Sequence, residues 1–194
     1  MSDFVFLEFA SQQVRDFLEE LRNALSGYQK ASPAHVTLRG PFVRPPNPDQ
    51  IERFADRLRG YGVRIGNHGY FTTPRGFSVF LRAECVVFRE MWYKPDFRSP
   101  LKDIQPHITV FESNDLEAVQ EVSNFLREEN ILIRTYDVYL RIYQSRMRQE
   151  QPDFFGPPIV SLDATPISQD VWDIRASVLD RARALGIRLS VHTR

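Results

Sequence analysis

The sequence has little cysteine and no long hydrophobic run. Its 194 residues include a single cysteine, Cys85, so an intramolecular disulfide is impossible and no cysteine-based zinc site is available. No apolar stretch approaches the roughly 20 residues that a membrane-spanning helix needs. Residues 1–9 also lack the basic segment that opens a secretory leader. We therefore expect a cytoplasmic protein with no membrane contact.

Net charge is also absent, because 25 basic residues balance 25 acidic ones. A protein that binds long nucleic acids through bulk electrostatics carries a basic excess, so the balance favours a small or single-stranded ligand instead. Only three of the basic residues are lysines, which leaves 22 arginines. Arginine suits phosphate because its planar fork donates two parallel hydrogen bonds. A codon bias toward arginine explains the same count, and composition does not separate the two explanations.

Hydrophobic periodicity predicts an α+β fold with mainly antiparallel sheet, in which the two halves of the chain look alike. Helices are expected to begin at Ser11, at Asp49 and at Asn114 or Asp115, and the first is expected to end at Gly27. A short helix is expected within 84–91, and a last one over 170–185, ending before Gly186. The expected strands are 4–9, 35–43, 63–71, 77–83, 107–111, a long one over 131–143, and 157–162.

Two short motifs share one pattern of histidine, apolar residue, threonine and apolar residue. They are His35-Val-Thr-Leu38 and His107-Ile-Thr-Val110, and each opens an expected strand shortly after a proline. Side chains two apart on a strand lie on the same face, about 6.5–7 Å from each other, so each strand presents an imidazole and a hydroxyl together. One such motif is explained by a strand-end histidine beside a threonine that favours strands. Two copies favour a paired site.

This pairing resembles the 2H phosphoesterase superfamily, which is named for two His-x-Thr/Ser motifs and includes 2′-5′ RNA ligase-like proteins and 2′,3′-cyclic nucleotide phosphodiesterases. Residues 35–42 are similar to the family's His-x-Thr-Leu followed by Gly-Pro-Phe. Residues 105–111 are similar to its Lys-Pro-His-x-Thr-Leu, with Gln105 in place of the usual basic residue. The resemblance implies a bilobal domain over 1–165, with two pseudo-symmetric antiparallel-sheet lobes, outer helices and a central cleft. We expect residues 166–194, which have no counterpart in the family's layout, to form a C-terminal helical extension.

The resemblance also implies a chemistry that needs no metal and no cofactor. One imidazole acts as general base on the attacking water or hydroxyl, and the other protonates the leaving ribose oxygen. Thr37 and Thr109 donate hydrogen bonds to the non-bridging phosphate oxygens. Which of His35 and His107 is the base stays open. The implied substrate is a 2′,3′-cyclic phosphate or a 2′-5′ linkage in an RNA terminus or a small nucleotide, and we expect a monomer.

Further residues are candidates for binding the substrate. Arg39 lies two residues after Thr37 and is either a phosphate ligand or a side chain that reaches into solvent. Phe42 and the Tyr70-Phe71 pair either stack on a base or belong to the core. The late strand supplies Tyr143 and Ser145, and Arg146 and Arg148 follow it as candidates for holding a second phosphate.

Two alternative functions stay open. In one, the same site acts on a cyclic oligonucleotide or another small phosphodiester; in the other, the protein binds RNA or a nucleotide without turnover. Metal ligation by His35 and His107 has little support, because no carboxylate or second histidine stands at ligand spacing. We expect His68 at a turn or strand edge and His192 in the tail.

Overall fold

Eight strands and five helices follow one another along the described residues of the computed structural model. These residues are 2–27, 29, 32–40, 42, 46–58, 60–73, 76–92, 105–145, 171–172 and 176–192. The elements are β1 (Ser2–Phe9), α1 (Gln12–Ser26), β2 (His35–Arg39), α2 (Pro48–Leu58), β3 (Val63–Thr73), β4 (Gly76–Glu84), α3 (Phe88–Trp92), β5 (His107–Ser113), α4 (Leu116–Glu129), β6 (Ile133–Thr135), β7 (Val138–Ser145), β8 (Val171–Trp172) and α5 (Ala176–His192).

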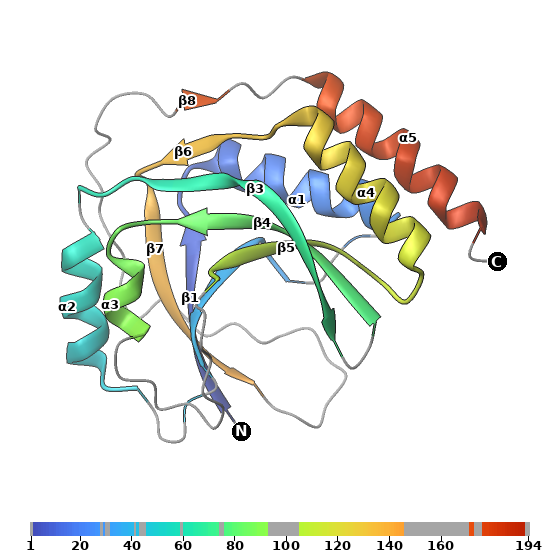
Figure 1. Ribbon diagram of the computed structural model, residues 1–194. Helices are drawn as coiled ribbons and strands as arrows, with labels where there is room; N and C mark the ends of the chain where they lie inside the picture. The colour runs from blue at the N-terminus through green and yellow to red at the C-terminus, as the bar shows by residue number, and fades with distance from the viewer. Residues whose placement is uncertain are drawn as a thin grey trace.

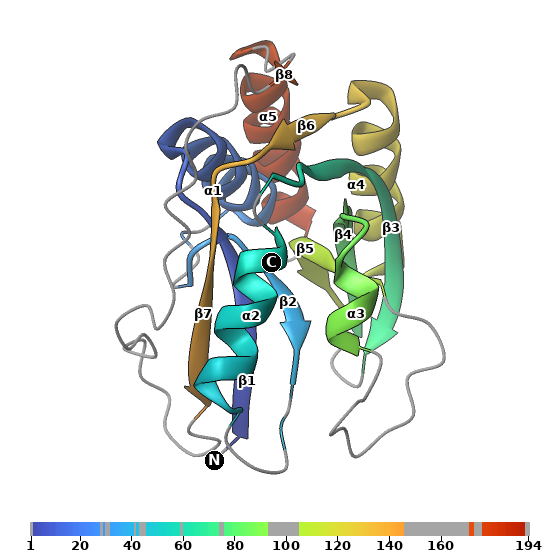
Figure 2. The same cartoon turned by 90° about the vertical axis from the view of Figure 1, so that its left-hand side faces the viewer.

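The strands form two sheets in which all neighbours are antiparallel. The three-stranded sheet has the order β2-β1-β7, and the five-stranded sheet has the order β5-β4-β3-β6-β8. The two strands that begin with a histidine, β2 and β5, are therefore both edge strands. They contact each other where the sheets meet, as Figures 1 and 2 show. The predicted α+β fold with two antiparallel sheets is confirmed.

One continuous core joins the sheets to the helices that cover them. Val5, Leu7 and Phe9 alternate along β1 and are fully buried, while Leu18 and Leu21 come from the apolar face of α1. Helix α4 packs against β3, β4 and β5 (Figure 1). This burial supplies most of the stabilisation of such elements, because an isolated helix of this length is marginal in water.

The helix ends follow the sequence signals at α1 and α4. Gly27 ends α1 in the left-handed conformation, with φ of 70°, where glycine has no steric penalty. Asp115 caps α4, since its carboxylate accepts a hydrogen bond of 2.9 Å from the backbone N–H of Glu117. The predicted N-cap Ser11 occupies its place at α1 but makes no side-chain capping bond.

The single long strand expected over 131–143 is wrong, because this stretch forms two strands in different sheets. Strand β6 pairs with β3, whereas β7 pairs with β1 along its full length. The chain changes sheet at 136–137, where the Asp137 N–H bonds to the Thr135 hydroxyl at 3.2 Å and the Asp137 carbonyl accepts from Ala10. Alternation of apolar residues continues through both strands, so it gave no sign of the break.

The predicted end of the last helix at Gly186 is also wrong, since α5 runs from Ala176 through Gly186 to His192. Gly186 faces α1 so closely that a Cβ there would lie 1.9 Å from the carbonyl oxygen of Ala24. The glycine thus permits helix contact instead of ending the helix. Helix α5 packs on α1 and α4 (Figure 1), and the strand expected over 157–162 lies outside the described residues.

Candidate active site

Both His-x-Thr motifs lie on strands and present their side chains as the spacing predicts. The apolar partners, Val36 and Leu38 on β2 and Ile108 and Val110 on β5, are at most 1% exposed. The histidines and threonines are half-buried and alternate with them. We call the face that carries the histidine and threonine the histidine face of each sheet. The adjacent edges β2 and β5 bring the two faces into one region of the molecule.

The two imidazoles are held in the same way. In His35, Nδ1 donates a hydrogen bond of 2.9 Å to the carbonyl oxygen of Pro33, and in His107, Nδ1 donates one of 2.6 Å to the carbonyl oxygen of Gln105. A carbonyl oxygen can only accept, so Nδ1 carries the hydrogen in both rings. The lone pair of each neutral ring is therefore on Nε2, which is left to act on a ligand.

Aromatic rings pack against both histidines. The ring of Phe6 stacks on His35, with centroids 4.0 Å apart and an interplanar angle of 18°. On the other sheet, His107 lies 4.9 Å from Phe80 and 5.2 Å from Phe71. Gly69 makes this arrangement possible, because a Cβ there would lie 2.7 Å from the Phe80 ring. The aromatic rings thus limit the orientations that each imidazole can adopt.

Burial lowers the pKa of both histidines. For His35 the pKa falls from 6.5 to about 4, mainly because burial disfavours the charged ring. The hydrogen bond to Pro33 opposes this shift, and the charges of Arg22 and His107 add to it. Burial also lowers the pKa of His107, against the hydrogen bond to Gln105. Both rings are therefore neutral at pH 7 when no ligand is bound.

A buried arginine supports the loop before His35. Arg22 on α1 is 6% exposed, and its Nη1 donates a hydrogen bond of 2.9 Å to the carbonyl oxygen of Ser32. Its Nη2 lies 3.4 Å from the Ser32 hydroxyl. Ser32 immediately precedes Pro33, whose carbonyl orients His35. No sequence pattern indicated this contact, since Arg22 stands among the polar residues of an amphipathic helix.

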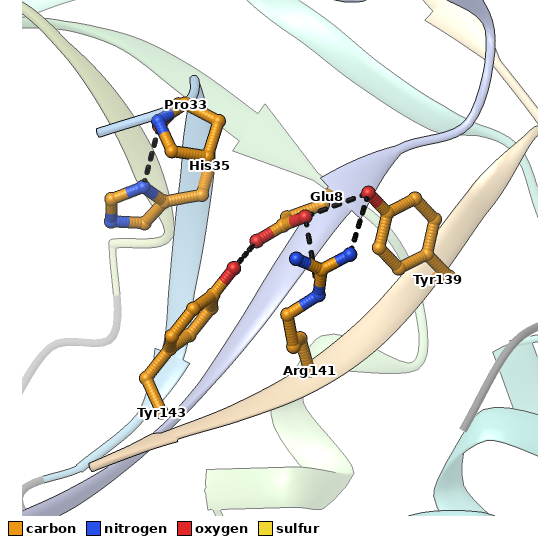
Figure 3. Close-up of polar contacts among 6 residues, drawn as sticks. All are labelled: Glu8, Pro33, His35, Tyr139, Arg141 and Tyr143. Carbon is orange, nitrogen blue, oxygen red and sulfur yellow. Dashed lines mark hydrogen bonds and ion pairs between the residues drawn. The ribbon is translucent and has the colours of Figure 1, made fainter. Parts of the chain in front are cut away.

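A second polar group that sequence reasoning missed lies on the histidine face of the three-stranded sheet (Figure 3). Glu8 is 3% exposed and pairs across the strands with His35 on β2 and with Tyr139 on β7. Its carboxylate accepts hydrogen bonds from the hydroxyls of Tyr139, at 2.7 Å, and Tyr143. The Nε of Arg141 lies 3.5 Å from Glu8 Oε2. Burial raises the pKa of Glu8, against the hydrogen bond from Tyr139 and the charge of Arg141.

Three further predicted binding residues, Arg39, Phe42 and Tyr70, lie in different surroundings. Arg39 is opposite Val5, at a register shift between β1 and β2, and it is half-buried like Thr37, so the alternation of burial along β2 continues through it. Its guanidinium lies 5.0 Å from the ring centroid of Phe42, which is 9% exposed. Tyr70 is opposite Val79, on the face of the sheet that does not carry His107.

Among the predicted residues on the late strand, Tyr143 belongs to the histidine face and lies 4.6 Å from Phe6. Ser145 ends β7, and its side chain is outside the described part of the structure, as are Arg146 and Arg148. His68 contacts no residue of either motif in the cross-strand register, where it is opposite Leu81. Within the described ranges, no group of three or more His, Cys, Asp or Glu residues could hold a metal ion, and no helix could span a membrane.

Comparison with known proteins identifies the family. A family model described as the 2′-5′ RNA ligase superfamily matches residues 10–136, which are more than half of the chain and contain both His-x-Thr motifs. No curated protein matches the chain. The antiparallel α+β fold agrees with the family match. The chain therefore belongs to the 2′-5′ RNA ligase superfamily, which is the 2H phosphoesterase superfamily.

Proposed function

We propose that this protein is a metal-independent phosphoesterase that hydrolyses a 2′,3′-cyclic phosphate or a 2′-5′ phosphodiester in an RNA end or a nucleotide. The matched orientation of His35 and His107 carries the proposal. Each donates Nδ1–H to a backbone carbonyl two residues before it, so each keeps a titratable Nε2 for acid–base chemistry. Two such nitrogens on adjacent strands suit general acid–base catalysis on one phosphorus centre.

In the proposed reaction, Nε2 of one histidine removes a proton from water, and the water oxygen forms a bond to phosphorus. The bond from phosphorus to a ribose oxygen breaks, and Nε2–H of the other histidine gives that oxygen its proton. Thr37 and Thr109 donate hydrogen bonds to the non-bridging oxygens, where negative charge increases in the transition state. The anionic substrate raises the pKa of nearby imidazoles, and this charges the acid.

The substrate's base or ribose is expected to contact aromatic side chains beside the histidines. Phe71 is 38% exposed and touches His107, so it is better placed for stacking than Tyr70. Tyr143 lies on the histidine face of the other sheet, whereas Phe42 is buried beneath Arg39. Tyr143 is only 3% exposed and its hydroxyl donates to Glu8, so Phe71 is the aromatic residue beside the histidines that is best exposed for stacking.

The test is incubation with a nucleoside 2′,3′-cyclic phosphate in excess EDTA, followed by phosphorus NMR. We expect the cyclic phosphate signal to be replaced by that of a 2′-monoester. His35→Ala and His107→Ala should each reduce kcat by about 10²–10⁴-fold, which is the usual contribution of one acid or base. His68→Ala is the matched control and should keep the wild-type rate, because His68 is opposite Leu81, on the face of the sheet that does not carry His107.

Turnover that survives both histidine substitutions, or that requires an added metal, contradicts the proposal. A folded wild-type protein that binds the nucleotide tightly without forming product supports the binding module. If only a cyclic oligonucleotide or another small phosphodiester reacts, and the histidine variants lose that activity, the chemistry stands with a different substrate.

A further inference from the structure

Three side chains with hydrogen-bond donors surround the carboxylate of Glu8, but only the two tyrosine hydroxyls form hydrogen bonds with it. The Tyr139 hydroxyl donates to Oε2 at 2.7 Å, and the Tyr143 hydroxyl donates to Oε1. Arg141 is close enough for an ion pair, at 3.5 Å, but its buried Nε has no hydrogen-bond acceptor among the described residues. Its one hydrogen bond there runs from Nη2 to the Tyr139 hydroxyl, at 3.3 Å.

The guanidinium is nevertheless fixed in place. It lies 5.1 Å from the ring centroid of Tyr139 and 5.9 Å from that of Tyr143 (Figure 3). Its side chain is 19% exposed, so part of it is open to a ligand. A buried ion pair is weak evidence for stability, because desolvating two charges offsets their attraction. An oriented arginine with unused donors suits recognition of an anion, above all a phosphate.

Arg141 on β7 and the His-x-Thr motif on β2 belong to the same sheet and are separated by one strand, β1. Phe6 on the central strand is opposite Thr37 on one side and Arg141 on the other. Neighbouring strands are about 4.8 Å apart, so the Cα atoms of Thr37 and Arg141 are separated by about 10 Å. An anion at Arg141 is therefore near the phosphate at Thr37 but distinct from it.

We propose that Arg141, held by Glu8 and Tyr139, binds a second phosphate of the substrate, so that the preferred substrate is a nucleotide or oligonucleotide with a phosphate beyond the one cleaved. This inference rests on the proposed function and narrows its substrate class. Glu8, Tyr139 and Arg141 all lie outside residues 10–136, so the family match does not assign this role. Arg141 is a binding residue, and Glu8 and Tyr139 are positioning residues.

The experiment compares two substrates that differ by one group: adenosine 2′,3′-cyclic phosphate with a 5′-hydroxyl and the same compound with a 5′-phosphate. The wild-type kcat/KM should be at least about tenfold higher for the 5′-phosphorylated compound, as expected for one hydrogen-bonded charge pair. Arg141→Met should bring this ratio close to one. Arg141→Lys keeps the charge without the fork, and should keep only part of the preference.

Positioning is tested by Tyr139→Phe, which removes the hydroxyl between Glu8 and Arg141 and should reduce the ratio without abolishing it. The matched control is Arg134→Met, since Arg134 also lies over a tyrosine ring, that of Tyr136 at 5.3 Å, but on the other sheet. That variant should keep the wild-type ratio. Thermal unfolding of every variant confirms that the compared proteins are folded.

Equal wild-type kcat/KM for the two substrates overturns the inference and leaves the proposed function intact. If neither substrate reacts, calorimetric binding of adenosine 2′,5′-bisphosphate and adenosine 2′-monophosphate decides the question without turnover. Tighter binding of the bisphosphate that is lost in Arg141→Met supports the second phosphate site while the proposed function fails. Equal affinities overturn the inference.

Discussion

At the scale of single residues, the two histidines make the same hydrogen bond to a backbone carbonyl, but the segments that carry these carbonyls are held in place differently. The carbonyl that orients His35 belongs to a loop attached to α1 through the two contacts between Arg22 and Ser32. The described surroundings of His107 contain no corresponding buried arginine, and no nearby cation contributes to its pKa shift. Arg22 thus acts on His35 in two ways, through the loop and through its charge.

Replacing Arg22 with Met should therefore impair His35 without touching the substrate. The loop would lose its two contacts, and we expect kcat to fall about tenfold, the value of one or two lost hydrogen bonds to a charged group, with KM little changed. The lost positive charge would also raise the pKa of His35. Arg22→Lys should restore part of kcat. An Arg22→Met enzyme with normal kcat and an unshifted pH profile would show that the arginine is only structural.

The sequence predicted His35, Thr37, His107 and Thr109 as candidates because each motif is local and repeated. It did not indicate Glu8 or Arg141, because their contacts join distant parts of the chain. Glu8 and Tyr139 are separated by 131 positions, and only the pairing of β1 with β7 brings them together. Strand alternation placed Arg39 on the face of Thr37, and the burial pattern of β2 agrees, but the sequence did not indicate the register shift between β1 and β2 at this point. Local patterns do not report such shifts.

At the scale of elements, the sequence predicted most strands and helices but not all of their bounds. The stretch 131–143 shows one alternation that covers two strands, since apolar periodicity reports which side chains are buried and not which sheet buries them. Glycine often marks the end of a helix, but Gly186 lies inside α5. The close approach of α1 and α5 requires a residue without a side chain at this position. In both cases, contacts between distant parts of the chain decide the structure, and the local sequence pattern does not report them.

Helix α5 provides a test of that close approach. Gly186→Ala should destabilise the protein, although alanine is about 1 kcal/mol better than glycine in a helix interior. The added Cβ would lie 1.9 Å from the Ala24 carbonyl oxygen, so α5 must move away from α1. We expect the free energy of unfolding to fall by about 1–3 kcal/mol, the usual cost of overpacking.

The measurement is urea-induced unfolding of both proteins, followed by circular dichroism. A gain in stability for Gly186→Ala would mean that helix propensity decides and that α5 tolerates displacement from α1. The expected loss would show that the last helix contributes to the stability of the whole domain. That result would extend the structural unit past residue 165, where the sequence suggested that a separate extension begins.

At the scale of the whole molecule, the candidate site depends on both sheets. Each sheet contributes one histidine from its edge strand, and the contact between β2 and β5 places the rings close enough for the charge of one to affect the other. Neither half of the chain contains a complete acid–base pair. The similarity of the two halves was visible in the sequence, whereas the electrostatic coupling of the rings follows only from the way the sheets meet.

The coupling leads to a prediction about pH. The pH profile of kcat/KM reports the pKa values of the free enzyme, where one histidine must be neutral and the other protonated. Burial lowers both pKa values below 6.5, that of His35 to about 4. The fraction in the active protonation state is largest between two such values, so kcat/KM should reach its maximum below pH 6.5. The two imidazoles titrate as a coupled pair, so the acidic and basic limbs of the kcat/KM profile report pKa values of the pair and not of one histidine.

The profile of kcat should be displaced to higher pH, because the bound phosphate favours the charged imidazole and raises the pKa values in the complex. Initial rates from pH 4 to pH 8.5 with a cyclic phosphate substrate, which does not itself titrate in this range, measure both profiles. Thermal unfolding at each pH separates loss of activity from loss of fold. A kcat/KM maximum at pH 7 or above would mean that the free histidines are not desolvated as their burial indicates. In Arg22→Met, the two limbs should move upward by different amounts, and the limb that moves further is the one to which His35 contributes more.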